Sequence, residues 1–263
     1  MSTATHVETI DRARPGVPLG RIVKVELRKM FDTRSGFWLM ASIAIISTLA
    51  TIGVIAFLPN ESMEYGAFAA AIGFPMAILL PIMAILSVTG EWSQRTGLIT
   101  FTLVPHRSQV ILAKAIAAVI VGIVSMVLAF AIGAVGNIVG SALNGVDTVW
   151  ATSFTEFLLI ILGNILGLLV GFMLGVLIRS TPGAIVAYFV YSFALPGIFG
   201  ALAAFQEWFR DIQLWIDFGA AQAPLFEGDV TAEQWAQIGV SGLIWLVIPM
   251  AIGVWAVLRS EVK

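Results

Sequence analysis

The sequence contains no cysteine and few charged residues, and both scarcities exclude whole classes of protein. Without cysteine, the chain forms neither a disulfide framework nor a thiolate metal site. Only 11% of the residues are charged and 59% are hydrophobic, whereas soluble domains carry roughly 25% charged residues. This composition predicts an integral membrane protein.

Residues that carry chemistry are also scarce. The two histidines, His6 and His106, are far apart in the sequence, so we expect no metal site and no zinc-dependent or serine-type intramembrane protease. No acidic residue or lysine lies in the middle of an apolar run, which disfavours a proton relay. The phosphate-loop pattern GxxxxGK[ST] is absent, so the chain does not bind ATP in the usual way. We expect a protein that is not an enzyme and holds no cofactor of its own.

Six apolar runs are long enough to cross a bilayer, which takes about 20 residues of helix. They are 37–58, 67–90, 110–133, 154–178, 182–204 and 238–258. Only helices satisfy their own backbone in lipid at this length, so the expected fold is an all-α, six-span membrane protein. A polar-spotted stretch at 134–145 either prolongs the third helix or leaves the bilayer.

Basic residues alternate between connections, and this alternation predicts the orientation. Of the 14 Lys and Arg residues, 12 lie before the first run, after the second, after the fourth or after the sixth. Lys114 lies just inside the third run, beside the second connection, and Arg210 is the exception. Both termini are therefore expected in the cytoplasm, in a multi-pass protein of the plasma membrane. The opposite side is expected to carry most of the acidic residues: Glu61, Glu64, Asp147, Glu156, Glu207, Asp211, Asp217, Glu227, Asp229 and Glu233.

The segment before the first span divides into a flexible cytoplasmic tail, 1–18, and an amphipathic helix, 19–36. One stripe of this helix is apolar (Leu19, Val23, Leu27, Met30 and Phe31), and another carries Arg21, Lys24 and Arg28. The pattern predicts an interfacial helix on membrane lipid, with Ser35 and Gly36 turning the chain into the bilayer. It acts either as a simple anchor or as a brace for a cytoplasmic partner. The six-span domain follows, over 37–263.

The fifth connection, 205–237, predicts a helical hairpin on the outer surface. Trp208, Ile212 and Trp215 share one helical face, and indole rings favour the interface. Thr231 and Gln234 have the spacing of a capping box that opens the last helix. The hairpin is either a static lid or an exit gate.

The fourth span carries four glycines at four-residue spacing, a pattern typical of close helix packing. They are Gly163, Gly167, Gly171 and Gly175. Prolines interrupt the second span at Pro75 and Pro81 and the fifth at Pro196. Such kinks either line a cavity or belong to ordinary membrane helices.

The most polar stretch between spans is 90–114. Glu91 and Arg95 are one helical turn apart, so the second span is expected to continue into the cytoplasm. The apolar piece at 98–104 needs a covering surface, and Pro105 suits the first turn of the next helix. This order predicts a docking element; a merely topogenic loop would not need the apolar centre.

The stretch resembles the first cytoplasmic loop of type 2 ATP-binding-cassette export permeases, and 25–29 resembles their amino-terminal interfacial helix. The residues that carry the loop resemblance are Glu91, Arg95, Thr96, Gly97, Pro105, His106, Arg107, Val110, Ala113 and Lys114. The six spans, the small size and the long fifth connection extend the likeness over nearly the whole chain.

The resemblance implies a permease dimer bound to a separate ATPase subunit that carries ATP and Mg, with no nucleic acid partner. ATPase coupling would fall to Glu91, Arg95, Thr96, Gly97, Pro105, Arg107 and Lys114. The translocation path would include Phe74, Pro75, Pro81, Phe193 and Pro196, and its lack of charge favours an amphiphilic or apolar cargo. An ATPase-independent secondary carrier and a non-transporting immunity or signalling protein remain as alternatives.

Overall fold

The computed structural model describes residues 17–32, 34–93 and 107–259, and every regular element in these ranges is a helix. Six helical stretches are long and apolar enough to span a membrane, which confirms the predicted number. They are Gly36–Phe57, Tyr65–Trp92, Arg107–Asn144, Phe154–Ile178, Thr181–Phe205 and Ala232–Arg259. The predicted tail at 1–18 lies almost entirely outside the described residues.

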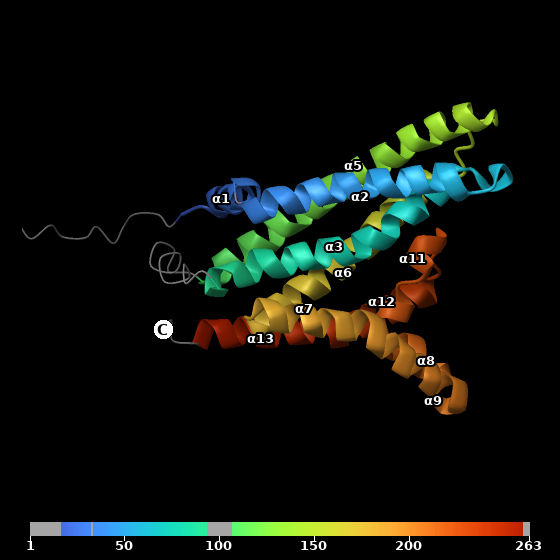
Figure 1. The fold of residues 1–263 in the computed structure, drawn as a ribbon. Helices are drawn as coiled ribbons and strands as arrows, with labels where there is room; N and C mark the ends of the chain where they lie inside the picture. The colour runs from blue at the N-terminus through green and yellow to red at the C-terminus, as the bar shows by residue number, and fades with distance from the viewer. Residues whose placement is uncertain (1–16, 33, 94–106, 260–263) are drawn as a thin grey trace, which may run out of the picture.

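The first half of the chain forms one side of the bundle (Figure 1). It comprises α1 (Leu19–Asp32), α2 (Arg34–Phe57), a 3₁₀ turn at Asn60–Ser62, α3 (Tyr65–Ser93) and α5 (Arg107–Asn144). α6 (Phe154–Ile178) crosses behind α3 and packs along it. The core lies between α3, α5 and α6, where Met76, Leu80, Met126, Leu168 and Phe172 are buried.

One helix boundary differs from the sequence-based prediction, and at a second the structure selects one of the two alternatives that the sequence left open. α1 ends at Asp32 and α2 begins at Arg34, so Ser35 and Gly36 are already helical and the break comes before them. The stretch 134–145 prolongs the third span, because α5 continues to Asn144. Its 38 residues correspond to a length of about 57 Å. Small residues permit this: a Cβ on Gly136 would collide with the Thr51 side chain of α2.

The second half of the chain forms the other side of the bundle (Figure 1). The fifth span consists of α7 (Thr181–Phe189), a π-helical turn at Val190–Ala194 and α8 (Leu195–Phe205). The sixth consists of α12 (Ala232–Gly242), a π-helical turn at Leu243–Val247 and α13 (Ile248–Arg259). The start of α1 and the end of α13 lie at the same end of the bundle, as an even number of spans requires.

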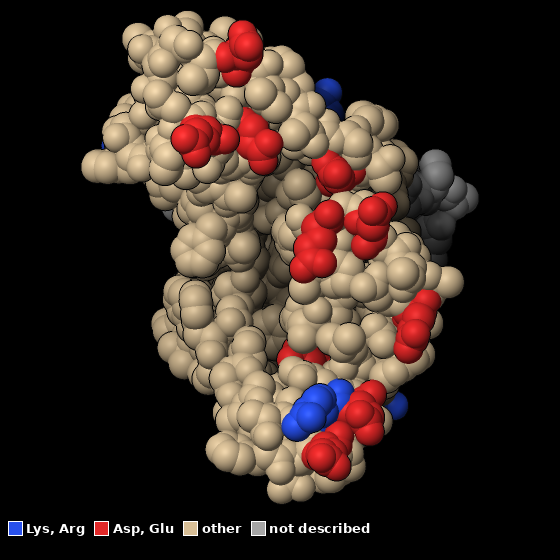
Figure 2. All heavy atoms as spheres, turned by 90° about the vertical axis from the view of Figure 1, so that its right-hand side faces the viewer, with Lys and Arg blue, Asp and Glu red and all other residues tan. Residues whose placement is uncertain are grey.

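Short helices join the fifth and sixth spans at the opposite end: α9 (Glu207–Ile216), α10 (Phe218–Ala221) and α11 (Pro224–Glu227). The predicted capping box is confirmed, since Thr231 N donates to Gln234 Oε1 at 2.8 Å and Gln234 N donates to Thr231 Oγ1 at 3.3 Å. Figure 2 shows this end of the molecule, where acidic side chains are spread over the surface and few basic ones are visible.

Candidate functional site

α1 packs one face against the bundle, and that face contains a carboxylate. Ile22 and Glu26, one turn apart, are 6% and 4% exposed, whereas Arg21, Lys24 and Arg28 are exposed on the opposite side. A buried carboxylate is costly unless it is paired and hydrogen-bonded. The way α1 is held therefore depends on the partners of Glu26.

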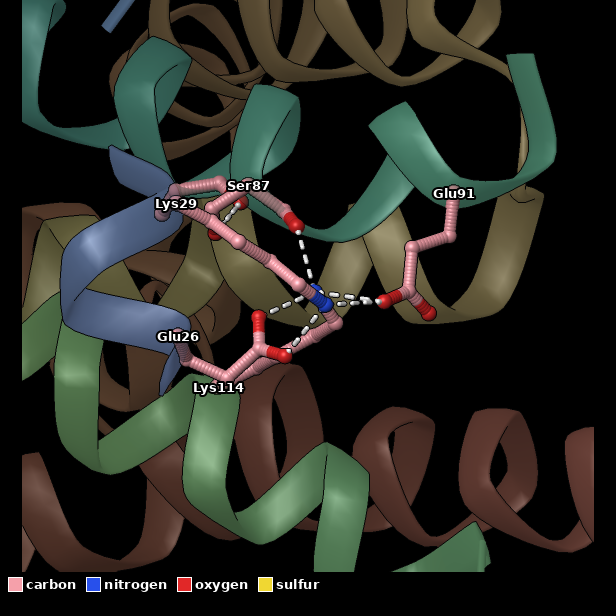
Figure 3. Close-up of polar contacts among 6 residues, drawn as sticks. Glu26, Lys29, Ser87, Glu91 and Lys114 are labelled. Atoms are coloured by element: carbon pink, nitrogen blue, oxygen red, sulfur yellow. Dashed lines mark hydrogen bonds and ion pairs between the residues drawn. The ribbon is translucent and has the colours of Figure 1, made fainter. Parts of the chain in front are cut away.

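Those partners form a closed ring of alternating charge with Glu26, which we call the ion ring (Figure 3). Lys29 Nζ lies 2.8 Å from Glu26 Oε1 and 3.3 Å from Glu91 Oε1. Lys114 Nζ lies 2.6 Å from Glu26 Oε2 and 3.1 Å from Glu91 Oε1. Each carboxylate contacts both ammonium groups, so the ring carries no net charge.

Lys114 is the most deeply buried cation of the ring, with a side chain only 6% exposed. Besides the two carboxylates, its ammonium donates to the backbone carbonyl of Ser87 at 3.1 Å. A lysine ammonium has three hydrogens to donate, and three acceptors lie within reach. This arrangement makes burial of a lysine two turns into α5 tolerable.

The two members of the ring that belong to α1, Glu26 and Lys29, have pKa values shifted in favour of their charged forms. Burial raises the pKa of Glu26, but Lys114 and Lys29 outweigh it and hold that pKa below the usual 4.5. Burial lowers the pKa of Lys29, but hydrogen bonds and attraction from Glu26 and Glu91 hold it above the usual 10.5. The stabilisation by Glu26 is therefore lost only as pH falls below 4.5, and that by Lys29 only as pH rises above 10.5.

The ion ring connects three elements at the two ends of the segment 94–106. Glu91 belongs to the last turn of α3, Lys114 lies near the start of α5, and the other two members belong to α1. The end of α3 and the start of α5, which flank this segment, are thus joined to each other and to α1.

Arg107 makes a separate connection at the same end. Its Nη1 donates to the backbone carbonyl of Val257 at 3.2 Å, in the last turn of α13. The last carbonyls of a helix have no partner within the helix, and arginine side chains commonly cap them. The first residue of α5 is therefore attached to the end of the sixth span.

The predicted coupling residues consequently divide into two groups. Glu91, Arg107 and Lys114 interact within the chain rather than projecting from it. Arg95, Thr96, Gly97 and Pro105 lie outside the described residues.

Sequence reasoning missed the role of Glu26 and Lys29 in this site. The available signals were an acidic residue one turn from Ile22 on the packing face and a lysine, Lys114, inside an apolar helix. Each of these charges needed a partner, but local sequence does not indicate which.

A second arrangement lies where α3, α6 and α7 meet. A Cβ placed on Gly171 would lie 2.5 Å from the backbone oxygen of Pro81, so only glycine allows this approach. Pro81 is itself buried against α6, and its place in a translocation path stays a prediction. Gly175 continues this contact between α6 and α3, because a Cβ placed on it would lie 3.2 Å from the Val88 side chain.

The other two predicted packing glycines lie in different surroundings. A Cβ on Gly163 would lie 2.6 Å from the Phe226 ring, so this glycine allows α11 to pack closely against α6. A Cβ on Gly167 would meet nothing within 4 Å, so no close approach occurs at this position. Four-residue spacing drifts around a helix by about 40° per step, which explains why the four glycines do not share one neighbour.

A side chain from α7 replaces the hydrogen bond that α3 lacks at Pro81. Pro81 has no N–H, so the carbonyl of Ala77, four residues earlier, loses its helical donor. Tyr188 supplies a substitute, because its hydroxyl donates to the Ala77 oxygen at 2.6 Å. The π-helical turn of the fifth span begins two residues after Tyr188.

Aromatic rings connect the π-helical turns of the last two spans. The Tyr191 and Trp245 rings are 5.8 Å apart, and Phe199 lies 6.3 Å from Trp245 and 5.6 Å from Phe209 of α9. Trp245 Nε1 donates to the Ile216 carbonyl at 2.7 Å. The connection between the fifth and sixth spans is thereby attached to both of them.

The remaining residues of the predicted path lie on the surface of the single chain. Phe74 and Phe193 are exposed, as is Pro196, whereas Pro75 is half-buried. Figure 2 shows a hollow near the centre of the end of the molecule that faces the viewer. Whether these residues line a path stays a prediction.

Within residues 17–32, 34–93 and 107–259, no three His, Cys, Asp or Glu side chains come together as a metal site would require. In comparisons with known proteins, no family model matches this sequence, and no curated protein matches it.

Proposed function

We propose that the chain is the permease subunit of an ATP-driven exporter, coupled through residues 90–114 to a separate ATPase. The observation that carries the proposal is the ion ring, which joins both ends of this segment to α1. A displacement of the segment would be passed to α3, α5 and α1 together, because opening the ring exposes buried, unpaired charges.

Within this proposal, Glu91 and Lys114 transmit motion instead of contacting the ATPase. Arg107 extends the transmission to the sixth span through its bond to the Val257 carbonyl. Contact with the ATPase would fall to the residues between them, where the sequence places an apolar centre flanked by Arg95. Contact and transmission are thus assigned to different residues.

The experiment separates these two roles. The chain is purified with a phosphate-loop ATPase encoded beside it, and complex retention and ATP hydrolysis are measured for two variants. Arg95→Glu should weaken the complex roughly ten- to several-hundred-fold, the effect of losing 1–4 kcal/mol at an interface. Glu91→Gln should leave the complex assembled but reduce the effect of the permease on ATP hydrolysis.

Arg210→Gln, at the opposite end of the bundle, is the matched control and should change neither readout. Retention of a fully coupled complex by both Arg95→Glu and Glu91→Gln would overturn the proposal. Cargo movement by the chain without an ATPase would favour a secondary carrier instead.

A further inference from the structure

The face of α1 that points away from the bundle carries a continuous stripe of cations. Arg21, Lys24 and Arg28 follow one another at spacings of three and four residues, and all three are exposed. Exposed apolar side chains flank the stripe, with Val25 on one side and Phe31 on the other. Asp32 is the one acidic residue on this face, 3.9 Å from Arg28, so the face is clearly positive.

Aromatic residues place this face at the level of lipid headgroups. Phe37 and Trp38, in the first turns of α2, are exposed, and their ring centroids are 5.9 Å apart. At the same end of the bundle, the exposed Trp255 of α13 carries the Arg259 guanidinium 4.4 Å above its ring. Tryptophan concentrates at the membrane–water interface. Because α1 lies at the same end of the bundle as these tryptophans, its outward face is at the level of the lipid phosphates.

We propose that the outward face of α1 is a binding surface for the phosphate groups of anionic lipids. The cations contact the phosphates, while Val25 and Phe31 enter the upper part of the acyl region. The ion ring gives this surface its orientation, because it holds the opposite face of α1 against α3 and α5. The proposal concerns lipid alone and does not depend on coupling to an ATPase.

The absence of native cysteine makes a direct test possible. A single cysteine at Val25, labelled with a small fluorophore, reports on the lipid beside α1 in the full-length protein. The protein is placed in mixed vesicles of phosphatidylcholine and phosphatidylglycerol, with a nitroxide near the top of the acyl chain of one lipid or the other. The ratio of quenching by the two labelled lipids measures the local enrichment of the anionic lipid.

We expect phosphatidylglycerol to be enriched at the probe and the enrichment to fall as salt is raised. Lys24→Gln and Arg28→Gln should each reduce it by up to about fivefold, the fold-change that corresponds to roughly 1 kcal/mol per cation near an anionic surface. Arg259→Gln removes a cation from the same end of the bundle but not from α1, so it should leave the enrichment unchanged.

A second cysteine position shows whether α1 remains docked. Ile22→Cys lies on the buried face and should react slowly with a thiol reagent in wild-type and charge-variant backgrounds alike. Equal quenching by the two lipids would overturn the proposal, as would enrichment that survives loss of both cations. Protection of the Val25 probe from both lipids would also overturn it, since protein would then cover the face.

Discussion

Substitution of Lys114 by methionine tests whether the ion ring holds α1 in place. Methionine fills much of the same volume but removes two ion pairs, at 2.6 and 3.1 Å, together with the bond to the Ser87 carbonyl. Glu26 and Glu91 would then share Lys29 alone. Breaking a buried ion pair costs about 3–5 kcal/mol, and the 44% exposure of Lys29 places this case at the lower end.

A cost of about 3 kcal/mol would raise the undocked fraction of α1 by roughly 150-fold. α1 can undock while the spans stay folded, because a local opening of a protein costs less free energy than global unfolding. The assay is the alkylation rate of a single cysteine at Ile22, which follows the open population when docking is faster than the reaction. A cysteine at Val25, exposed in both states, is the control and should react at an unchanged rate.

The double variant Glu26→Gln/Lys114→Met makes the prediction specific to charge. It leaves one balanced pair, Lys29 with Glu91 at 3.3 Å, so alkylation at Ile22 should be slower than in Lys114→Met alone. Coupling of this kind is expected only for residues that interact directly. Unchanged alkylation in Lys114→Met would refute the reasoning, and so would a double variant at least as reactive as the single one.

Three further predictions concern packing, the hydrogen bond to the Ala77 carbonyl and topology. Gly171→Leu should lower the yield of folded protein and Gly167→Leu should not, because only the first Cβ would meet the Pro81 backbone, at 2.5 Å; equal yields would contradict this. Tyr188→Phe leaves the Ala77 carbonyl without its donor and should destabilise the protein by about 1–3 kcal/mol in thermal unfolding. Tyr65→Phe is the comparison: it removes a longer hydrogen bond, 3.2 Å to the Phe130 carbonyl, and should destabilise the protein less. Single cysteines at the exposed Asp147 and Asp229 should react with an impermeant thiol reagent outside intact cells, and one at Ser108 should not. The reverse labelling pattern would show that the chain has the opposite orientation in the membrane.

The spans were predictable because hydropathy is a local property of the sequence. Twenty apolar residues in lipid leave the backbone few alternatives to a helix, and the capping box at Thr231 and Gln234 involves neighbours in the chain. The end of the third span was harder, because the polar residues of 134–145 reduce the hydropathy signal. Glycines such as Gly136 allow that stretch to pack against α2, and this depends on what α2 presents.

The candidate site was not predictable, because its contacts join distant parts of the chain. Glu26 pairs with Lys114, 88 residues away, and Tyr188 donates to a carbonyl 111 residues away. A lysine inside an apolar helix needs a partner, but the sequence alone does not select one carboxylate among several as the partner of Lys114. Only the helix arrangement selects Glu26 and Glu91 and turns the predicted contact residue Glu91 inward.

The length of α5 has a consequence for the membrane itself. At about 57 Å it exceeds the roughly 30 Å hydrocarbon layer by far, yet its outward side remains apolar as far as the exposed Val135, Ile138 and Leu143. A tilt of about 40°, near the upper limit for membrane helices, reduces its vertical span to roughly 44 Å, close to a bilayer with its headgroups. The angle between α5 and the shorter α2 would then respond to bilayer thickness, and lipids of different chain length would shift the conformational balance without binding at any specific site.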